Sequence, residues 1–450
     1  MIQQALPRHL SFIDLQRHAP DRYALLLESV ADSKTLSRWD FLFIANGEGL
    51  ICDARNQTRN LSGERLPGLF LDVLDAEWNK TANENHDSDI PFRGGWALFL
   101  AYELAGQIES RLNLPVSDTP LPMALALRCP AALLRNKNTG DVFFIAETDN
   151  VEVQVRLQED IAALGNLAPI AALSKPQFIN EEAPEKFLGG VKKIHQYLRQ
   201  GDTFQVNLSR AWCAEFAETP EPASLYQSLC RHNPAPFAGS LIHQDWALLS
   251  SSPERLVSCH GGEVQTRPIA GTRPRFPGDD DGHRIQELVG HPKERAEHVM
   301  LIDLERNDLG RVCEPGSVHV DELMGVESYA HVHHIVSNVR GRLRAEVTPG
   351  QVIAAVFPGG TITGCPKVRC MEIIAELEAE ARGPYTGAMG YLNHNGDMDL
   401  NILIRSAWLS QEKCELRAGA GIVVDSVAEH ELQETRAKAK GLLRALGADV

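Results

Sequence analysis

Positive charge is scarce in this chain of 450 residues, which has 44 Lys and Arg against 60 Asp and Glu and a formal net charge of −16. Binding to nucleic acid requires a basic surface that neutralises phosphates, and anionic membranes also attract basic segments. We therefore expect neither a nucleic-acid partner nor a membrane partner. The hydrophobic content of 43%, with 23% charged residues, is typical of a globular protein rather than a disordered one.

Cysteine pairs at metal-binding or redox spacing are also missing. The nine cysteines are scattered without a C-x-x-C pair, which argues against a zinc ribbon or a redox dithiol. No apolar run approaches the length of a membrane-spanning helix, because the longest, at 95–104, is short and contains Glu103. The first twenty residues lack the apolar segment of a secretory signal. These features predict reduced thiols and a cytoplasmic location.

Internal repeats are absent as well, and length alone suggests roughly three domains. A segment rich in Ala and Pro at 165–176 predicts a connector, which divides the chain into an N-terminal region at 1–170 and a second region at 180–450. Beyond it, helical periodicity from Pro184 to Gly201 and the strict alternation from Met398 to Ile404 predict a helix and a strand. Further predicted strands follow one another through short turns, with helices between them. This pattern predicts a mainly antiparallel α+β fold.

Two pairs of glutamates have the spacing that places both side chains on one helix face. Glu294 and Glu297 fall in one predicted helix, and Glu431 and Glu434 fall in the last one. Four carboxylates from two helices would suit Mg²⁺ that shares its coordination shell with an anionic substrate. The alternative is that both pairs are solvated surface residues.

A glycine-rich loop at 359–366 precedes a predicted helix and is a candidate anion site, or simply a tight turn with a helix cap. It lacks the Gly-Lys-Ser/Thr ending of a nucleotide-binding P-loop. Glu254, in a Ser-Pro-Glu-Arg turn, is a candidate general acid if apolar neighbours raise its pKa, and otherwise a solvated glutamate. The chain has no G-x-S-x-G nucleophile signature.

Two other groups of basic residues are weaker candidates. Arg267 and Arg273 flank a Pro/Gly loop and are placed to meet an anion, although such a loop is also an ordinary bend. His333 and His334 are neighbours on a predicted strand, so their side chains point to opposite faces. That arrangement argues against a metal ion bound by both histidines.

Taken in order, six motifs resemble those of the chorismate-utilising enzymes. This family includes the large subunits of anthranilate synthase and aminodeoxychorismate synthase, and more distantly the isochorismate and salicylate synthases. The motifs are GDTFQVNLSR at 201–210, SPER at 252–255, TRPIAGTRPR at 266–275, KERAEHVMLIDLERNDLGR at 293–311, FPGGTITGCPKVRCM at 357–371 and AGAGIV at 418–423. They span roughly residues 180–445, and the N-terminal region matches more loosely. The resemblance implies one large α+β fold in which two antiparallel sheets pack over one core.

The resemblance also implies roles for individual residues. Glu254 is the acid that assists loss of the ring hydroxyl, and His334 lies near the ring. Glu297 and Glu434 bind Mg²⁺, with Glu294 and Glu431 close by through water. The catalytic set is Glu254, His334, Lys438, Gln205 and Ala270, and the substrate-binding set is Arg405, Tyr385, Thr361, Gly419, Gly421, Gly271 and Thr272.

Two of these positions bear on the nucleophile and the product. In isochorismate and salicylate synthases, a lysine that activates water stands where this chain has Gln205. An amide is a poor base, so the resemblance favours ammonia rather than water as the nucleophile. Ala270 stands where aminodeoxychorismate synthases typically carry a lysine that adds to the ring, and alanine is usual in anthranilate synthases. The motifs at 233–238 and 357–364 instead resemble the aminodeoxychorismate branch, and the first lacks the Tyr-Met pair usual in tryptophan-regulated anthranilate synthases.

The resemblance therefore favours an aminodeoxychorismate synthase that supplies p-aminobenzoate for folate and works without a covalent lysine adduct. Anthranilate synthase is the alternative, and a catalytically silent chorismate-binding regulator is a third reading. The chain shows no glutamine amidotransferase motif. We therefore expect a separate glutamine amidotransferase subunit to supply ammonia in a heterodimer.

Overall fold

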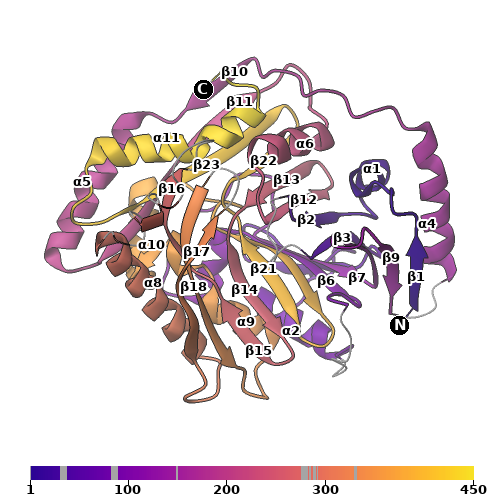
Figure 1. The fold of residues 1–450 in the computed structure, drawn as a ribbon, viewed down its shortest axis with the longest axis horizontal. Coiled ribbons are helices and arrows are strands. Elements are labelled where there is room, and N and C mark those ends of the chain that lie inside the picture. Colours follow the sequence, from indigo (N-terminus) through magenta and orange to yellow (C-terminus); the bar gives the residue numbers. More distant parts are fainter. Residues whose placement is uncertain are drawn as a thin grey trace.

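Two large antiparallel sheets form the centre of the molecule in the computed structural model (Figure 1). It describes residues 2–30, 38–82, 90–147, 151–274, 292–328 and 332–449, together with 282, 285, 286 and 290. The predicted α+β class, with two antiparallel sheets, is confirmed.

The first sheet contains strands from both ends of the chain. Its order is β1 (Ile2–Leu6), β9 (Val142–Ala146), β8 (Ala131–Asn136), β3 (Trp39–Ile44), β2 (Leu25–Glu28), β12 (Phe237–His243), β13 (Trp246–Ser252), β22 (Ser406–Ser410), β23 (Lys413–Ile422), β11 (Gln205–Glu215) and β10 (Phe178–Glu181), with β19 (Gly364–Cys365) paired to β11.

The second sheet is built in the same mixed way. Its order is β16 (Ile269–Pro274), β18 (Val332–Arg342), β15 (Glu263–Thr266), β14 (Arg255–His260), β21 (Met398–Ile402), β20 (Ala388–Asn393), β6 (Gly95–Leu100), β7 (Ala124–Cys129), β4 (Gly49–Cys52) and β5 (Thr58–Asn60), with β17 (His319–Ser328) paired to β18. The N-terminal strands join the later ones where β2 pairs with β12 and β6 pairs with β20. Both sheets are therefore continuous across the two parts of the sequence.

Three apolar clusters hold these layers together. One lies between the sheets and includes Phe43 and Leu248 of the first sheet with Phe99 and Tyr391 of the second. The other two lie on the outer faces, where the helices pack. The helices of the described residues are α1 (Phe12–His18), α2 (Phe70–Asn79), α3 (Ala105–Ile108), α4 (Val151–Ala163), α5 (Pro184–Gln200), α6 (Pro222–His232), α8 (Pro292–Gly310), α9 (Pro349–Val356), α10 (Lys367–Glu378) and α11 (Ala428–Ala445).

Several predicted elements are confirmed in detail. Helix α5 begins at Pro184 and ends at Gly201, whose φ of 80° provides the left-handed C-cap that glycine favours. Of the predicted connector at 165–176, the first two residues belong to the 3₁₀ turn Leu164–Asn166, and residues 167–176 form neither helix nor strand. The alternation predicted through Ile404 stops earlier, because β21 ends at Ile402 and Arg405 has a φ of 53°. A turn, rather than a strand, therefore presents the Arg405 side chain.

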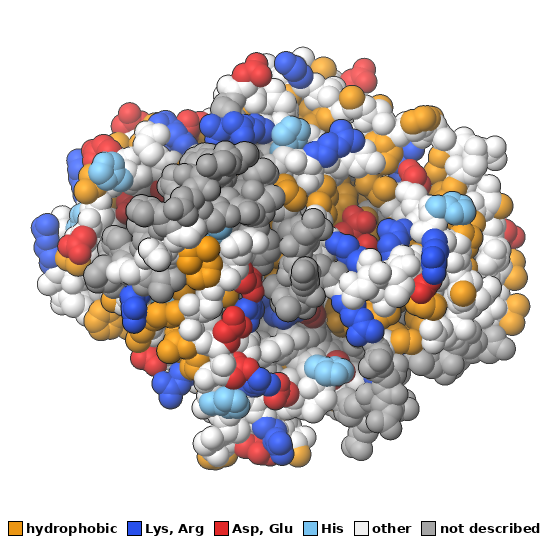
Figure 2. All heavy atoms as spheres, in the orientation of Figure 1, with side chains coloured by type: hydrophobic (Ala, Val, Ile, Leu, Met, Phe, Trp, Pro, Cys, Tyr) orange, Lys and Arg blue, Asp and Glu red, His pale blue; other side chains and the backbone are white. Residues whose placement is uncertain are grey.

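The surface carries both signs of charge. On the face shown in Figure 2, acidic and basic side chains are interspersed around apolar ones. Within the described parts of the chain, every helix is too short or too polar to span a bilayer.

Candidate active site

Glu254 lies in the turn between β13 and β14, and its side chain is 5% exposed. The turn is fixed because the Ser252 hydroxyl donates to the Ile402 carbonyl at 2.6 Å, and the Glu254 carbonyl accepts from the Ile402 amide at 3.0 Å. Burial raises the pKa of Glu254 to about 7. A carboxyl group with this pKa keeps its proton in a large fraction of molecules at neutral pH, as a general acid must.

Four neighbours of Glu254 oppose the effect of burial on its pKa only in part. They are the Thr361 hydroxyl, the Ile269 amide, Lys438 and Arg405. Thr361 belongs to the predicted glycine-rich loop, which forms the single 3₁₀ turn Gly360–Ile362 before α10. The loop thus contributes a side-chain hydroxyl beside the acid.

The two cations of the site differ in their surroundings. The Lys438 ammonium, on α11, pairs with Glu434 at 2.7 Å and donates to the Gly419 carbonyl at 3.0 Å. The half-buried Arg405 guanidinium makes no hydrogen bond or ion pair with any described residue. Its electrostatic neighbours are Tyr385, Glu434 and Glu254. Since buried or half-buried charges normally find partners, Arg405 is suited to binding an anion.

Strands β11 and β23 present a polar surface beside these cations. The side-chain oxygens of Gln205 and Asn207 are buried and have no hydrogen-bond partner among the described residues. A Cβ on Gly419 would lie 2.7 Å from both the Tyr385 hydroxyl and Asn207 Oδ1, and one on Gly421 would lie 2.2 Å from Gln205 Nε2. Glycine at both positions leaves space for these polar groups.

His334 and the bulge in β16 form the remaining side. His334 lies on β18 opposite residue 272, and β16 changes register between Ala270 and Thr272, where Gly271 has a φ of 64°. Burial, followed by the charge of Arg405, lowers the pKa of His334 to about 4, so its imidazole is neutral at pH 7. The side chains of Ala270 and Thr272 lie outside the described part of the structure.

The four glutamates predicted to bind a metal ion lie on two helices. Glu294 and Glu297 lie near the start of α8, and Glu431 and Glu434 lie near the start of α11. Among the described residues, no three His, Cys, Asp or Glu side chains are placed to hold one metal ion. The Glu434 carboxylate is engaged by Lys438 instead. The donor type suits Mg²⁺, and these are the carboxylates that would hold such an ion.

Arg267, a weaker candidate for binding an anion, is engaged by carboxylates of the protein itself. Its guanidinium pairs with Glu322 at 2.7 Å and with Glu327 at 2.6 Å, both on β17. The side chain of Arg273 lies outside the described residues. The Pro/Gly loop here is a bend with internal ion pairs.

Sequence reasoning missed buried carboxyl groups further along α8. Glu305 and Asp308 are 7% and 3% exposed, and the Lys367 ammonium pairs with Asp308 at 2.5 Å. Burial and the charge of Asp308 raise the pKa of Glu305 to about 8, although Lys367 opposes this. Glu305 also interacts electrostatically with Glu254. The available signal was their i, i+3 spacing, which repeats that of Glu294 and Glu297 on the same helix.

Comparisons with known proteins show which family this chain is similar to. The sequence matches the family of chorismate binding enzymes over residues 30–444. It is 40% identical to aminodeoxychorismate synthase component 1 of Bacillus subtilis, over 82% of this chain and 80% of the relative. It is 46% identical to anthranilate synthase component 1 of Aquifex aeolicus, over 94% and 89%. The crystal structure of anthranilate synthase component I from Streptococcus pneumoniae superposes with a TM-score of 0.82 at 33% identity, covering 91% of this chain and 93% of that one.

Proposed function

This chain belongs to the family of chorismate-binding enzymes and acts on chorismate, and from that premise we propose that it is an aminodeoxychorismate synthase. The proposed net reaction is the replacement of the ring hydroxyl of chorismate by ammonia, which yields 4-amino-4-deoxychorismate and water. The product would serve p-aminobenzoate and folate synthesis. The observation that carries the proposal is the buried carboxyl of Glu254, whose pKa is about 7.

The proposed steps assign a task to each group. Glu254 gives its proton to the leaving ring oxygen, which departs as water, and the added ammonia later loses the proton that restores the balance. Arg405 and Tyr385 bind the enolpyruvyl carboxylate, because the Arg405 guanidinium has no protein partner among the described residues. Lys438 and the Gly419–Gly421 backbone bind the ring carboxylate. With an amide at Gln205, ammonia rather than water is the proposed nucleophile.

Metal dependence and a partner subunit are further parts of the proposal. Enzymes of this family are generally Mg²⁺-dependent, and we propose Glu297 and Glu434, with Glu294 and Glu431 nearby, as the ligands. Relatives are named component 1, which implies a second subunit. We propose a glutamine amidotransferase as that subunit and a cytoplasmic heterodimer as the working form. Chelation of Mg²⁺ that leaves turnover unchanged would remove the metal from the scheme.

Anthranilate synthase is the second candidate, and Ala270 is the observation that favours it. In that reaction the amino group would be retained on the ring carbon next to the one that bears the carboxylate, and the enolpyruvyl group would leave as pyruvate to give anthranilate. In the proposed reaction a first ammonia adds to the ring as the hydroxyl leaves as water, and a second ammonia then adds at the hydroxyl-bearing carbon as the first departs as ammonia. One nitrogen is retained, and the first ammonia takes the place of the covalent lysine adduct that Ala270 cannot form.

Product analysis separates the two candidates. The purified chain would be incubated with chorismate, Mg²⁺ and ammonium, and the products resolved by chromatography. We expect a product that becomes p-aminobenzoate only after a separate lyase is added. Fluorescent anthranilate as the main product would contradict the proposal, and an absence of any turnover with ammonium or with the amidotransferase would favour a silent chorismate-binding regulator.

A further inference from the structure

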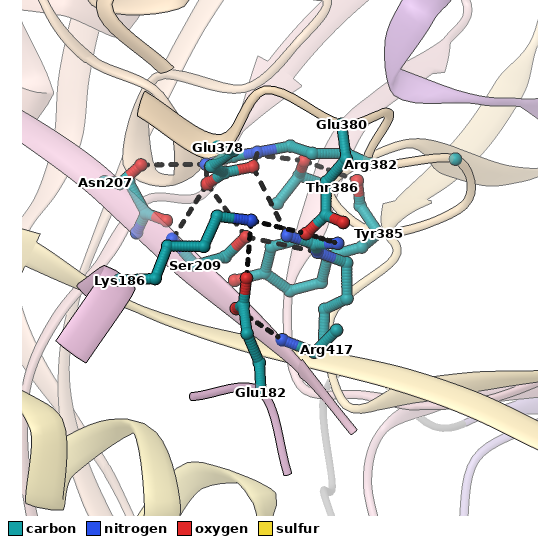
Figure 3. A network of polar contacts seen from close by, with 12 residues as sticks. Glu182, Lys186, Asn207, Ser209, Glu378, Glu380, Arg382, Tyr385, Thr386 and Arg417 are labelled. Atoms are coloured by element: carbon teal, nitrogen blue, oxygen red, sulfur yellow. Dashed lines mark hydrogen bonds and ion pairs between the residues drawn. The ribbon is translucent and has the colours of Figure 1, made fainter. Parts of the chain in front are cut away.

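A buried ion pair between Arg382 and Glu378 lies beside Tyr385, one of the proposed carboxylate-binding residues (Figure 3). The Arg382 side chain is 1% exposed and that of Glu378, at the end of α10, is 2% exposed. The guanidinium binds the carboxylate through two atoms, with Nε to Oε2 at 2.9 Å and Nη2 to Oε1 at 2.7 Å. This bidentate pair leaves three of the five guanidinium N–H groups for other acceptors.

The three remaining donors of Arg382 reach three separate chain segments. Nη1 donates to the Ile362 carbonyl at 3.1 Å and to the Thr386 hydroxyl at 3.3 Å, and Nη2 donates to the Asn207 carbonyl at 2.8 Å. Each acceptor is on the same strand or turn as a substrate-facing group: Gln205 on β11, Thr361 in the 3₁₀ turn and Tyr385 in the turn after α10. All five donors are therefore used, and three of them join the segments that form the site.

Aromatic rings and the main chain fix the guanidinium further. Its central carbon lies 4.9 Å from the ring centre of Tyr102 and 5.5 Å from that of Tyr385. The Arg382 amide donates to the Glu103 carboxylate at 2.7 Å. The Tyr385 ring is thus held by a cation as well as by its own turn.

We propose that Arg382 is a positioning residue of the site, holding the segments of Gln205, Thr361 and Tyr385 in register without touching the substrate. The inference rests on the proposed function for the identity of the ligand. A buried ion pair generally adds little to the stability of a protein. The hydrogen bonds that join Arg382 to several chain segments explain the presence of this pair better than its contribution to stability does. Lysine has three donors and no planar fork, so it cannot replace this arrangement.

Arg417 provides a matched control within the same network. Its side chain is 4% exposed and lies 3.6 Å from the other side of Glu378, and it also pairs with Glu380 at 3.1 Å. Its Nε donates to the Ser209 hydroxyl at 3.3 Å, but within the described structure it makes no hydrogen bond to the 3₁₀ turn or to the Tyr385 turn. A substitution of Arg417 therefore removes a similarly buried positive charge beside Glu378 but leaves the three segments connected through Arg382.

The test compares R382M, R382K and R417M in the full chain. We expect R382M to raise KM for chorismate at least about tenfold more than R417M does, with comparable losses of melting temperature in both. R382K is expected to lie between wild type and R382M in KM. Equal KM changes in R382M and R417M, or an unchanged KM in R382M, would overturn the inference.

Hydrogen exchange gives a readout that does not depend on chorismate. In the substrate-free chain, R382M is expected to speed amide exchange in residues 205–209, 360–363 and 383–386 together, while R417M leaves the last two segments at the wild-type rate. Should R382M fail to fold, the isosteric T386V removes one acceptor and should raise KM a few-fold. Absence of chorismate turnover in wild type contradicts the proposed function alone, whereas unchanged exchange in R382M or unchanged KM in T386V contradicts the positioning role.

Discussion

Two arginines near the site, Arg382 and Arg405, are placed in opposite ways. All five donors of Arg382 bind protein acceptors, whereas the Arg405 guanidinium has no hydrogen bond or ion pair within the described structure. Burying an unpartnered cation is unfavourable unless a ligand completes it. This difference is what we expect if Arg382 organises the protein, as proposed above, and Arg405 binds a carboxylate of the substrate.

The largest effect on the rate is expected at Glu254, the proposed acid, which is an electrostatic neighbour of Arg405. The substitution E254Q keeps the size of the side chain but removes the transferable proton. We expect kcat with chorismate and ammonium to fall roughly 10²- to 10⁴-fold, with little change in KM, because general acid catalysis is lost and binding is kept. Steady-state kinetics checks this, and a variant that retains the full rate would exclude Glu254 as the acid.

Loss of the unpartnered cation should affect catalysis without harming the fold. In R405M we expect kcat/KM for chorismate to fall roughly 30- to 1000-fold, because a desolvated carboxylate of the substrate loses its cation. This corresponds to a loss of about 2–4 kcal/mol in transition-state binding free energy. The melting temperature should stay at the wild-type value or rise. A large loss of stability in R405M would mean that the guanidinium has a structural role and would weaken the contrast with Arg382.

The pH dependence sharpens the assignment of the acid. As pH rises through about 7, Glu254 loses its proton, so the rate at a fixed concentration of free ammonia should fall about tenfold per pH unit above that value. The residual rate of E254Q should lack this limb. Because the folded pKa is raised above the ordinary value of 4.5, the group favours the folded state at low pH, and its contribution is lost as pH rises from about 4.5 through 7. Denaturant unfolding at several pH values should therefore show E254Q gaining stability relative to wild type over this interval.

The smallest effect is expected at an arginine whose partners are partly exposed. Arg267 pairs with Glu322, whose side chain is 43% exposed, and with Glu327, whose side chain is 18% exposed. In R267M we expect a loss of about 1 kcal/mol in unfolding free energy and an unchanged rate. A rise in KM for chorismate would instead restore Arg267 as a substrate-binding residue.

The sequence was informative wherever local periodicity dominates the structure. Helix α5 with its Gly201 cap and the start of strand β21 follow from spacing alone, because a regular element repeats its buried face every few residues. The strand before Arg405 was predicted too long, since alternation continues through Ile404 while the chain already turns. Tertiary contacts, here the bond from the Ile402 amide to Glu254, decide where that strand ends.

The polar interior could not be predicted in the same way. Arg382 and its acceptor Asn207 are 175 positions apart, and no local pattern indicates that they meet. Glu305 and Asp308 have the composition of ordinary helix-surface acids, yet both are buried. On α8 the two pairs of acids, Glu294 with Glu297 and Glu305 with Asp308, look alike in sequence, and only the packing of the helix shows that both members of the second pair are buried. The contacts of these buried polar residues are therefore known only from the three-dimensional structure.

The joining of early and late strands has a consequence for synthesis of the chain. Leu100 of β6 pairs with Ala388 of β20, 288 positions later. At about 5–20 residues per second, β6 emerges from the ribosome roughly 15–60 s before its neighbour exists. During that interval one edge of the N-terminal strands is unpaired, and such edges template aggregation. Nascent chains truncated before residue 388 should therefore depend on chaperones, while the complete chain should not.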